Sequence, residues 1–413
     1  MSVPPDGLAV RQPCDGYPLP LRLLLILGGL SAFGPLAIDL YLPAFPAMAH
    51  SFATDTEQIQ LSLSAYFLGL ALGQVFYGPI ADRFGRRKPL LFGISLFTLA
   101  SVACAFAPSL EWLLAARFAQ ALGGCAGMVV NRAIVRDLCT PIESAKVFSQ
   151  LMLVMGVAPI LAPLAGGWLM LLGGWESIFI ALALFSAAFG VLVLLRLPET
   201  LAVDGPRSQL SSALGRYARL LREPAFMFHA LTGGVAMAGM FAYIAGSPFI
   251  FIELYGVPAE HYGWLFGLNS AGFILAAQLN GRLLRRRTPL QLLRSTTVLF
   301  MCSTLALALI AALETDSLWP LMVPLFLCMA LLALVVPNSS ACALAGQGHQ
   351  AGVASALMGT LQFTIAGLVS ALVGALHDGT ALPMALMISL CGVGSAGMAL
   401  MARRVKGGDV GFR

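Results

Sequence analysis

Two residues of opposite charge stand within long apolar stretches of this 413-residue chain. Asp39 follows sixteen uncharged residues, and the apolar run resumes for seven residues after it. Arg117 lies a little over one helical turn after Trp112, where a later apolar stretch begins. An ionised side chain at membrane depth costs roughly 2.5–3.5 kcal/mol, so both residues are functional candidates.

These two stretches are predicted to run in opposite directions, which brings Asp39 and Arg117 to a similar depth. We expect the carboxylate and the guanidinium to be paired, directly or through water, because either charge alone would be costly in apolar surroundings. A carboxylate held in this way could carry a proton, and the arginine would stabilise its ionised form. The alternatives are a hydrated Asp39 at the outer boundary and an Arg117 that snorkels to the headgroups.

The composition predicts which elements hold these residues. Apolar residues make up 59% of the chain and charged residues 10%, with a mean hydropathy of +0.86, whereas a soluble domain carries about 25% charged residues. A spanning helix needs about 20 apolar residues. Twelve such windows occur, near 23–46, 58–81, 90–109, 112–135, 147–172, 177–196, 226–252, 262–281, 289–312, 318–340, 351–376 and 381–402. We therefore predict an all-α membrane protein with twelve transmembrane helices, because backbone polar groups in lipid must be paired within their own segment.

Basic residues predict the orientation. None of the 24 Lys and Arg residues falls in an inferred outer link, so the positive-inside rule places both termini in the cytoplasm. The net charge of +5 is then a topology signal, and we expect no nucleic-acid partner. The eight cysteines have neither zinc nor redox spacing, and no phosphate-binding loop occurs. We expect no metal, no cofactor and no enzymatic activity.

The longest polar interval between windows divides them six and six. We predict a cytoplasmic N-terminal tail (1–22), a six-helix bundle (23–196), a cytoplasmic linker (197–225), a second, pseudo-symmetric six-helix bundle (226–402) and a cytoplasmic tail (403–413). A weak repeat supports the division, because a shift of 200 residues aligns Arg86-Arg87-Lys88-Pro89-Leu90 with Arg286-Arg287-Thr288-Pro289-Leu290. In the linker, Ser211 to Arg222 fits either a surface helix, with Leu214, Tyr217, Ala218 and Leu221 on its apolar face, or a solvated connection.

A short charged link joins the second and third windows and predicts a tight cytoplasmic turn. It reads Gly78-Pro79-Ile80-Ala81-Asp82-Arg83-Phe84-Gly85-Arg86-Arg87-Lys88-Pro89. It resembles the signature loop G-x-x-x-D-R-x-G-R-R of the major facilitator superfamily of secondary transporters, which it matches at Gly78, Asp82, Arg83, Gly85, Arg86 and Arg87. We expect Asp82 to cap the turn, or to pair with Arg136 or another cation of the fourth window and so latch the inner side. The arginines would also contact anionic lipid.

Two further segments extend the resemblance. Arg117-Phe118-Ala119-Gln120-Ala121 resembles the R-x-x-Q-G motif of drug exporters, with Ala121 in place of glycine. Residues 158–167 resemble the antiporter motif G-x-x-x-G-P-x-x-G-G at Pro163, Gly166 and Gly167, and a packing face would explain its small residues but not the pair Pro159 and Pro163. With Asp39-Leu40-Tyr41-Leu42-Pro43 and Pro198-Glu199-Thr200, the chain is similar to the Bcr/CflA (bicyclomycin/chloramphenicol resistance) family of drug/proton antiporters.

This resemblance implies export of small lipophilic drugs, such as bicyclomycin-like and chloramphenicol-like compounds, in exchange for protons by alternating access at the bacterial inner membrane. The alternative is a proton-coupled uptake symporter for a small metabolite or sugar, in which the Pro159/Pro163 pattern would be absent. We expect a monomer, and we assign no role to Arg132. A central cavity near the midplane is predicted to be faced by polar residues, each of which could instead be an interhelical hydrogen bond: Tyr41, Tyr66, Gln120, Asn131, Tyr243, Asn269, Asn338 and Gln362.

Overall fold

The computed structural model describes residues 20–139, 141–201, 210–347 and 350–405. These residues form helices and connections with no strand among them, which confirms the predicted all-α class. Twelve helices in this part of the chain have 19 or more residues: α1 (Leu21–Asp39), α3 (Thr56–Phe84), α4 (Arg87–Ala105), α5 (Leu110–Leu138), α6 (Pro141–Gly173), α7 (Glu176–Arg196), α9 (Pro224–Pro248), α10 (Ala259–Leu283), α11 (Pro289–Ala311), α12 (Trp319–Leu344), α13 (Ala351–Ala375) and α14 (Leu382–Arg404). Nearly all of the predicted N-terminal tail, the middle of the linker and most of the C-terminal tail lie outside the described residues.

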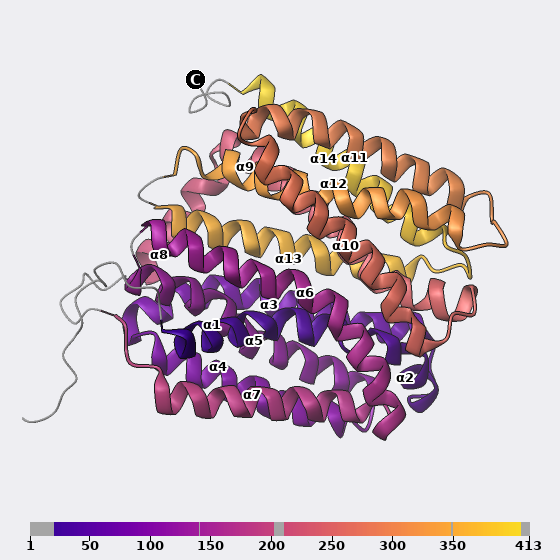
Figure 1. The fold of residues 1–413 in the computed structure, drawn as a ribbon, viewed down its shortest axis with the longest axis horizontal. Coiled ribbons are helices and arrows are strands. Elements are labelled where there is room, and N and C mark those ends of the chain that lie inside the picture. The colour runs from indigo at the N-terminus through magenta and orange to yellow at the C-terminus, as the bar shows by residue number, and fades with distance from the viewer. Residues whose placement is uncertain (1–19, 140, 202–209, 348–349, 406–413) are drawn as a thin grey trace, which may run out of the picture.

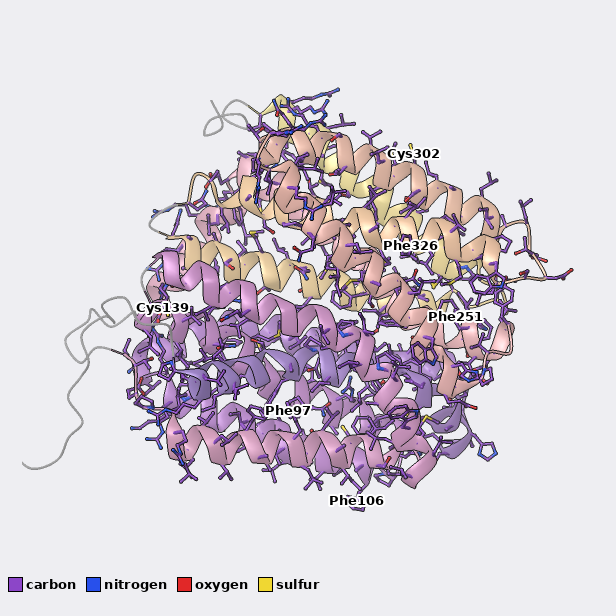
Figure 2. All side chains as sticks on the ribbon, viewed as in Figure 1. Phe97, Phe106, Cys139, Phe251, Cys302 and Phe326 are labelled. Carbon is purple, nitrogen blue, oxygen red and sulfur yellow. The ribbon has the colours of Figure 1, made fainter. Side chains whose placement is uncertain are left out.

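The long helices are apolar enough for a bilayer, with two qualifications. Ten segments in the described part of the chain meet the length and hydropathy that crossing requires, including Leu21–Ser51 and Pro224–Leu254. The apolar segment of α6 is the shorter Val157–Gly173, which falls below that length, and α10 is not among the ten. Large apolar side chains point outward, such as Leu172 with 83% of its surface exposed. In Figure 2, the labelled side chain of Phe106 is one such apolar group that projects away from the helices.

The helices form two bundles that repeat one pairing pattern (Figure 1). In the first bundle α3 and α4 both pack on α5, α4 packs on α7, and α1 packs on α6. In the second bundle α10 and α11 both pack on α12, α11 packs on α14, and α9 packs on α13. Each helix of the second set stands where its counterpart stands in the first, as expected for related halves. The predicted bundle boundaries themselves stay a prediction.

The two bundles meet along two helix pairs, α3 with α13 and α6 with α10. Small residues allow these pairs to approach closely. A Cβ at Gly359 of α13 would lie 2.6 Å from Oε1 of Gln74, and a Cβ at Gly374 would lie 2.9 Å from the carbonyl oxygen of Glu57. One apolar core therefore runs through both bundles.

The linker contains the expected surface helix, α8 (Leu210–Leu221). Its buried residues are Tyr217 and Leu220, which pack against a cluster that includes Phe226 of α9 and Leu357 of α13. Of the predicted apolar face, Tyr217 is buried, Ala218 and Leu221 are exposed, and the side chain of Leu214 lies outside the described part. Contact of this face with the membrane surface stays a prediction.

Candidate functional site

The first membrane-length segment is broken immediately after Asp39. α1 ends at Asp39, residues 40–41 form a turn, and the 3-10 helix η1 (Leu42–Ala44) leads into α2 (Phe45–Ser51). Pro43 has no N–H to bond the carbonyl of Asp39, so the break lacks one of the hydrogen bonds of a continuous α-helix. Asp39 is held at this break with 3% of its surface exposed. We call the end of the bundle at which Leu21 and Arg404 lie the terminal end, and the opposite end the distal end.

Gly166 of α6 packs directly on the break. A Cβ at Gly166 would lie 1.8 Å from the carbonyl oxygen of Leu40, which no side chain could tolerate. A Cβ at the next residue, Gly167, would lie 3.3 Å from the Cα of Glu260 in α10. The two glycines of the predicted antiporter motif therefore allow α6 to approach α1 on one side and the second bundle on the other.

The two prolines of this motif do not interrupt α6, although each removes one backbone hydrogen bond from it. Pro163 is buried and Pro159 is half-buried. The alanines that precede them, Ala158 and Ala162, are both buried. These positions lie in a packed part of the helix, and the antiport role of the motif stays a prediction.

Arg117 is fully buried within the first bundle, between aromatic rings. Its guanidinium carbon lies 4.3 Å from the ring centroids of both Tyr41 and Tyr66, and 5.8 Å from that of Phe179. A cation over an aromatic face is attracted by the electrons of the ring, by about 2 kcal/mol when water is excluded. Tyr41 is fixed in turn, since its hydroxyl lies 2.9 Å from the Ser62 hydroxyl.

Hydrogen bonds complete the enclosure of Arg117. Its Nη2 donates to the carbonyl oxygen of Ala37 over 2.9 Å, and its Nη1 donates to Oε1 of Gln120. The Gln120 amide in turn donates to the Ser101 hydroxyl over 2.7 Å. Tyr41, Tyr66 and Gln120, predicted to face a central cavity, thus enclose Arg117 and have no exposed surface.

The predicted direct ion pair between Asp39 and Arg117 does not occur, while a pairing through water stays a prediction. The ion pairs among the described residues include none that joins the two. Arg117 instead bonds the carbonyl of Ala37, two residues earlier in α1. Arg117 thus reaches α1 close to the depth of Asp39 but has other partners.

Asp39 points toward the second bundle. It interacts electrostatically with the phenol groups of Tyr243 in α9 and Tyr262 in α10. Its Oδ1 is buried and has no hydrogen-bond partner. The Tyr243 hydroxyl accepts a hydrogen bond of 3.0 Å from the Asn269 amide, and the Tyr262 hydroxyl lies 2.7 Å from that of Ser247. Of these four residues, sequence reasoning had selected Tyr243 and Asn269.

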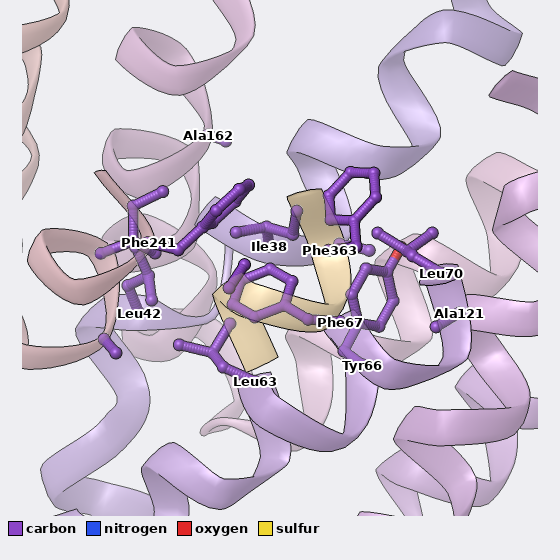
Figure 3. Close-up of a cluster of buried hydrophobic side chains, with 14 of the residues drawn as sticks. Ile38, Leu42, Leu63, Tyr66, Phe67, Leu70, Ala121, Ala162, Phe241 and Phe363 are labelled. Carbon is purple, nitrogen blue, oxygen red and sulfur yellow. The ribbon is translucent and has the colours of Figure 1, made fainter. Parts of the chain in front are cut away.

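Three phenylalanines from both bundles pack in one apolar cluster (Figure 3). The ring centroid of Phe67 in α3 lies 4.4 Å from the ring centroid of Phe241 in α9 and 6.4 Å from that of Phe363 in α13. Figure 3 also shows Ile38, the residue before Asp39, within this cluster. Sequence reasoning missed all three rings, because a phenylalanine in an apolar span carries no signal of its own.

The remaining candidates of the predicted cavity connect helices. Asn131 donates to the carbonyl of Leu27 and to the hydroxyl of Ser31, both in α1, over 2.8 and 2.7 Å. Asn338 of α12 donates to the side-chain oxygen of Asn280 in α10 over 2.7 Å. Gln362 of α13 is half-buried, and its backbone lies against Gly234 of α9. Asn131 and Asn338 are therefore interhelical hydrogen bonds.

At the terminal end, the charged link is shorter than predicted. α3 continues through Gly78 and Asp82 to Phe84, and α4 begins at Arg87, so only Gly85 and Arg86 separate the helices. The predicted partner of Asp82 was also wrong. Arg86, which is 3% exposed, donates from Nη1 to Asp82 over 2.5 Å and from Nε to Asp137 over 2.8 Å. Asp82 therefore pairs within its own link and not with the cations of α5.

Gly85 and Glu199 together shape this turn. Gly85 has a φ of +90°, and a Cβ there would lie 2.4 Å from Oε2 of Glu199. The Glu199 carboxylate accepts hydrogen bonds from the backbone N–H groups of Arg86 and Arg87 over 2.7 and 3.2 Å. Burial raises the pKa of Glu199, but these bonds and those from Thr200 and Leu201 outweigh it and lower the pKa below its ordinary value.

The other residues of the link motif have separate surroundings. Arg87 donates to the carbonyl of Leu194, while Arg83 is exposed with its guanidinium over the Phe84 ring. Nothing lies within 4 Å of a Cβ built on Gly78. Arg136 is exposed and faces α13, where its Nη1 would lie 3.7 Å from a Cβ on Gly352. Contact of these arginines with lipid stays a prediction.

At the distal end, side chains from the two bundles bind one another. Nε2 of His377, just after α13, lies 2.9 Å from Oε1 of Glu57 in α3. The Thr56 hydroxyl donates to Glu253 of the π-helix η2 (Phe249–Leu254). The Phe249 ring packs edge-on against His377, with centroids 4.2 Å apart. These contacts join the two bundles at the distal end.

Comparison with known proteins gives consistent matches. A model of the Major Facilitator Superfamily matches residues 26–371. An uncharacterized MFS-type transporter, YdgK, of Bacillus subtilis (strain 168) is 39% identical over 379 residues, which is 91% of this chain and 94% of the relative. Multidrug resistance protein D of Escherichia coli (strain K12) is 30% identical over 373 residues, covering 90% and 93%. A bicyclomycin resistance protein homolog of Haemophilus influenzae is 29% identical over 369 residues, covering 89% and 92%.

Solved structures share the fold at low sequence identity. A bacterial homolog of the human lysosomal transporter Spinster, in an inward-facing and occupied conformation, superposes with a TM-score of 0.71 at 15% identity, covering 95% of this chain and 98% of that one. The human organic anion transporter MFSD10 superposes with a TM-score of 0.67 at 18% identity, covering 94% and 100%. The arrangement of twelve long helices in two bundles is therefore that of transporters of this architecture.

Proposed function

This chain belongs to the major facilitator superfamily, and on that premise we propose that it exports small lipophilic drugs in exchange for protons by alternating access. Relatives that share about nine tenths of the chain carry the names bicyclomycin resistance and multidrug resistance, which supports drug efflux. The absence of Lys and Arg from the inferred outer links supports cytoplasmic termini and a place in the bacterial inner membrane. The terminal end would then face the cytoplasm.

The observation that carries the proton assignment is the position of Asp39. It is the one acidic residue at a helix break in α1, it is buried, and its Oδ1 has no partner. Burying an ionised carboxylate without a partner is costly, so the closed arrangement favours the neutral carboxyl group. Separation of the bundles would expose the same group to water and allow it to ionise.

Asp39 lies between the two bundles, which move relative to each other in alternating access. This position would couple the proton flux to the drug flux. It faces Tyr243 and Tyr262 of the second bundle, so any substrate that enters between the bundles changes its surroundings. A drug that enters from the cytoplasmic side would favour loss of the proton, and reprotonation from the outer side would favour release of the drug. Occupancy of the site by either the proton or the drug couples the two fluxes without direct contact between them.

Arg117 would then support the site without sharing the proton. Its bond to the Ala37 carbonyl and its aromatic enclosure fix the last turn of α1, which holds Asp39. Gly166 fixes the other side of the break by packing on Leu40. A rigid support of this kind keeps the carboxyl group aimed at the second bundle while the bundles move.

The test is drug accumulation in an efflux-deficient bacterial host, with chloramphenicol as the probe, with and without a protonophore. We expect the wild type to lower chloramphenicol accumulation only while the proton gradient is maintained. Asp39→Asn is expected to abolish gradient-driven export, while the exposed loop variant Asp316→Asn retains it. Purified wild-type protein should also release protons when chloramphenicol is added, and Asp39→Asn should not. Gradient-dependent export by Asp39→Asn would falsify the proton assignment.

A further inference from the structure

Arg132 lies within α5 and is nevertheless exposed. Its neighbours Asn131 and Ile134 are buried against the first bundle. The guanidinium reaches the other way, with Nη1 3.3 Å from the hydroxyl oxygen of Ser355 in α13 of the second bundle. A side chain that contacts the opposite bundle does not snorkel to lipid. Arg132 therefore stands in the gap between the bundles at the terminal end.

No carboxylate balances this charge among the described residues. Two acidic residues at the same end of the bundle, Asp82 and Asp137, are both bound to Arg86. The first turn of α13 has no acidic residue. One turn further along α5, Arg136 presents a second guanidinium to the same helix near Gly352. Two arginines thus face α13, and the Ser355 hydroxyl is the hydrogen-bond partner of Arg132 in the described part of the chain.

Asp39 cannot supply the missing charge either. Asp39 ends α1, which places it roughly 27 Å from the terminal end at about 1.5 Å per residue. Arg132 lies six residues before the end of α5 at Leu138, which corresponds to roughly 9 Å. The difference in depth is several times the reach of an ion pair. Arg132 is therefore independent of the proton site.

We propose that Arg132 selects substrates by charge, and that it binds the carboxylate or another anionic group of a drug that enters between the bundles. A guanidinium offers planar paired donors that match a carboxylate, and the bond is strengthened where water is partly excluded. The neighbouring Arg136 raises the local positive potential, which favours an anion further and disfavours a cationic drug. The inference rests on the proposed drug export, because it names the substrate class that this site prefers.

The test is equilibrium binding to the purified full chain in detergent at pH 7.5, with nalidixate as the anionic probe, chloramphenicol as the neutral probe and ethidium as the cationic probe. For Arg132→Gln we expect nalidixate affinity to fall on the order of tenfold or more, as loss of a charged hydrogen bond predicts. Chloramphenicol affinity should change less than twofold, and ethidium affinity should be unchanged or higher. Arg132→Lys, which keeps the charge, should recover part of the nalidixate affinity.

The exposed Arg285→Gln, which removes a cation beyond the end of α10, is the matched control and should bind all three probes as the wild type does. The inference is overturned if Arg132→Gln binds nalidixate as tightly as the wild type, if it loses all three probes equally, or if the wild type does not bind nalidixate. Binding is separate from transport. Failure of gradient-driven chloramphenicol export in cells would therefore count against the proposed function, and a charge-independent binding profile would count against Arg132.

Discussion

Arg117 donates a hydrogen bond of 2.9 Å from Nη2 to the carbonyl oxygen of Ala37, and it forms no ion pair with Asp39. The two charges that the sequence places at one depth are separated by the body of α1. One of them supports the helix from within the first bundle, and the other faces the second bundle. The arginine therefore supports α1, and proton exchange at the aspartate is the role proposed above.

A double-mutant cycle measures this separation. Arg117→Lys should lower the free energy of unfolding by about 2–3 kcal/mol, because it loses charged hydrogen bonds and aromatic contact. Asp39→Asn, which removes no partner, should change it by less than about 1 kcal/mol. The coupling energy from reversible unfolding in mixed micelles should stay within about 0.5 kcal/mol, as for residues that do not interact. A coupling energy of several kcal/mol would mean that Asp39 and Arg117 interact as an ion pair, as the sequence predicted.

The glycines of the two motifs should differ in their tolerance of a methyl group. Gly166→Ala places a Cβ 1.8 Å from the Leu40 carbonyl, so α6 must move away from the break. We expect a loss of stability of about 1–3 kcal/mol or more and loss of chloramphenicol export. Gly78→Ala is the control, because it meets nothing within 4 Å inside a helix and should be neutral or stabilising. Equal effects of the two variants would contradict the packing described for α6.

The carboxylate of Glu199 predicts a pH dependence of stability. Its pKa in the folded protein lies below its ordinary value, so the stabilisation is present above the unfolded value near 4.3 and is lost as pH falls through the folded value. Thermal unfolding should show Glu199→Gln less stable than the wild type at pH 7, with the difference shrinking below about pH 4. The exposed Glu314→Gln should show no such trend. If the stability difference between Glu199→Gln and the wild type did not change with pH, the charge of Glu199 would not explain it.

The contact between Glu57 and His377 predicts control of the distal end. His377 contacts Glu57 of the other bundle over 2.9 Å, so loss of the imidazole should weaken closure of the distal end. His377→Gln should shift the population toward the outward-open state. Distances between nitroxides at Asp55→Cys and Asp316→Cys, in a cysteine-free background, report the state. The neighbouring Asp378→Asn is the control, and an unchanged distance distribution in His377→Gln would rule out a latch.

The sequence by itself determined the class, the helices and their approximate ends. Apolar windows of about 20 residues admit one solution in lipid, because each backbone group must be bonded within its own helix. The tight turn at the charged link was also local, and Gly85 turns the chain there with a positive φ, whereas the break after Asp39 falls inside the predicted window 23–46. These effects act over a few residues, so they can be read without knowing what lies opposite. The family followed from motifs of the same local kind.

Only the tertiary structure decided which side of each helix meets which neighbour. Depth follows from counting residues along a span, but it does not say which neighbours a side chain meets, and this separated Asp39 from Arg117. It also turned Tyr41, Tyr66 and Gln120 inward around the arginine, and it gave Asp82 to Arg86 in place of Arg136. In spans that are apolar on every side, no pattern of hydrophobicity marks the inward face. The packing of helices from distant parts of the chain supplies that choice.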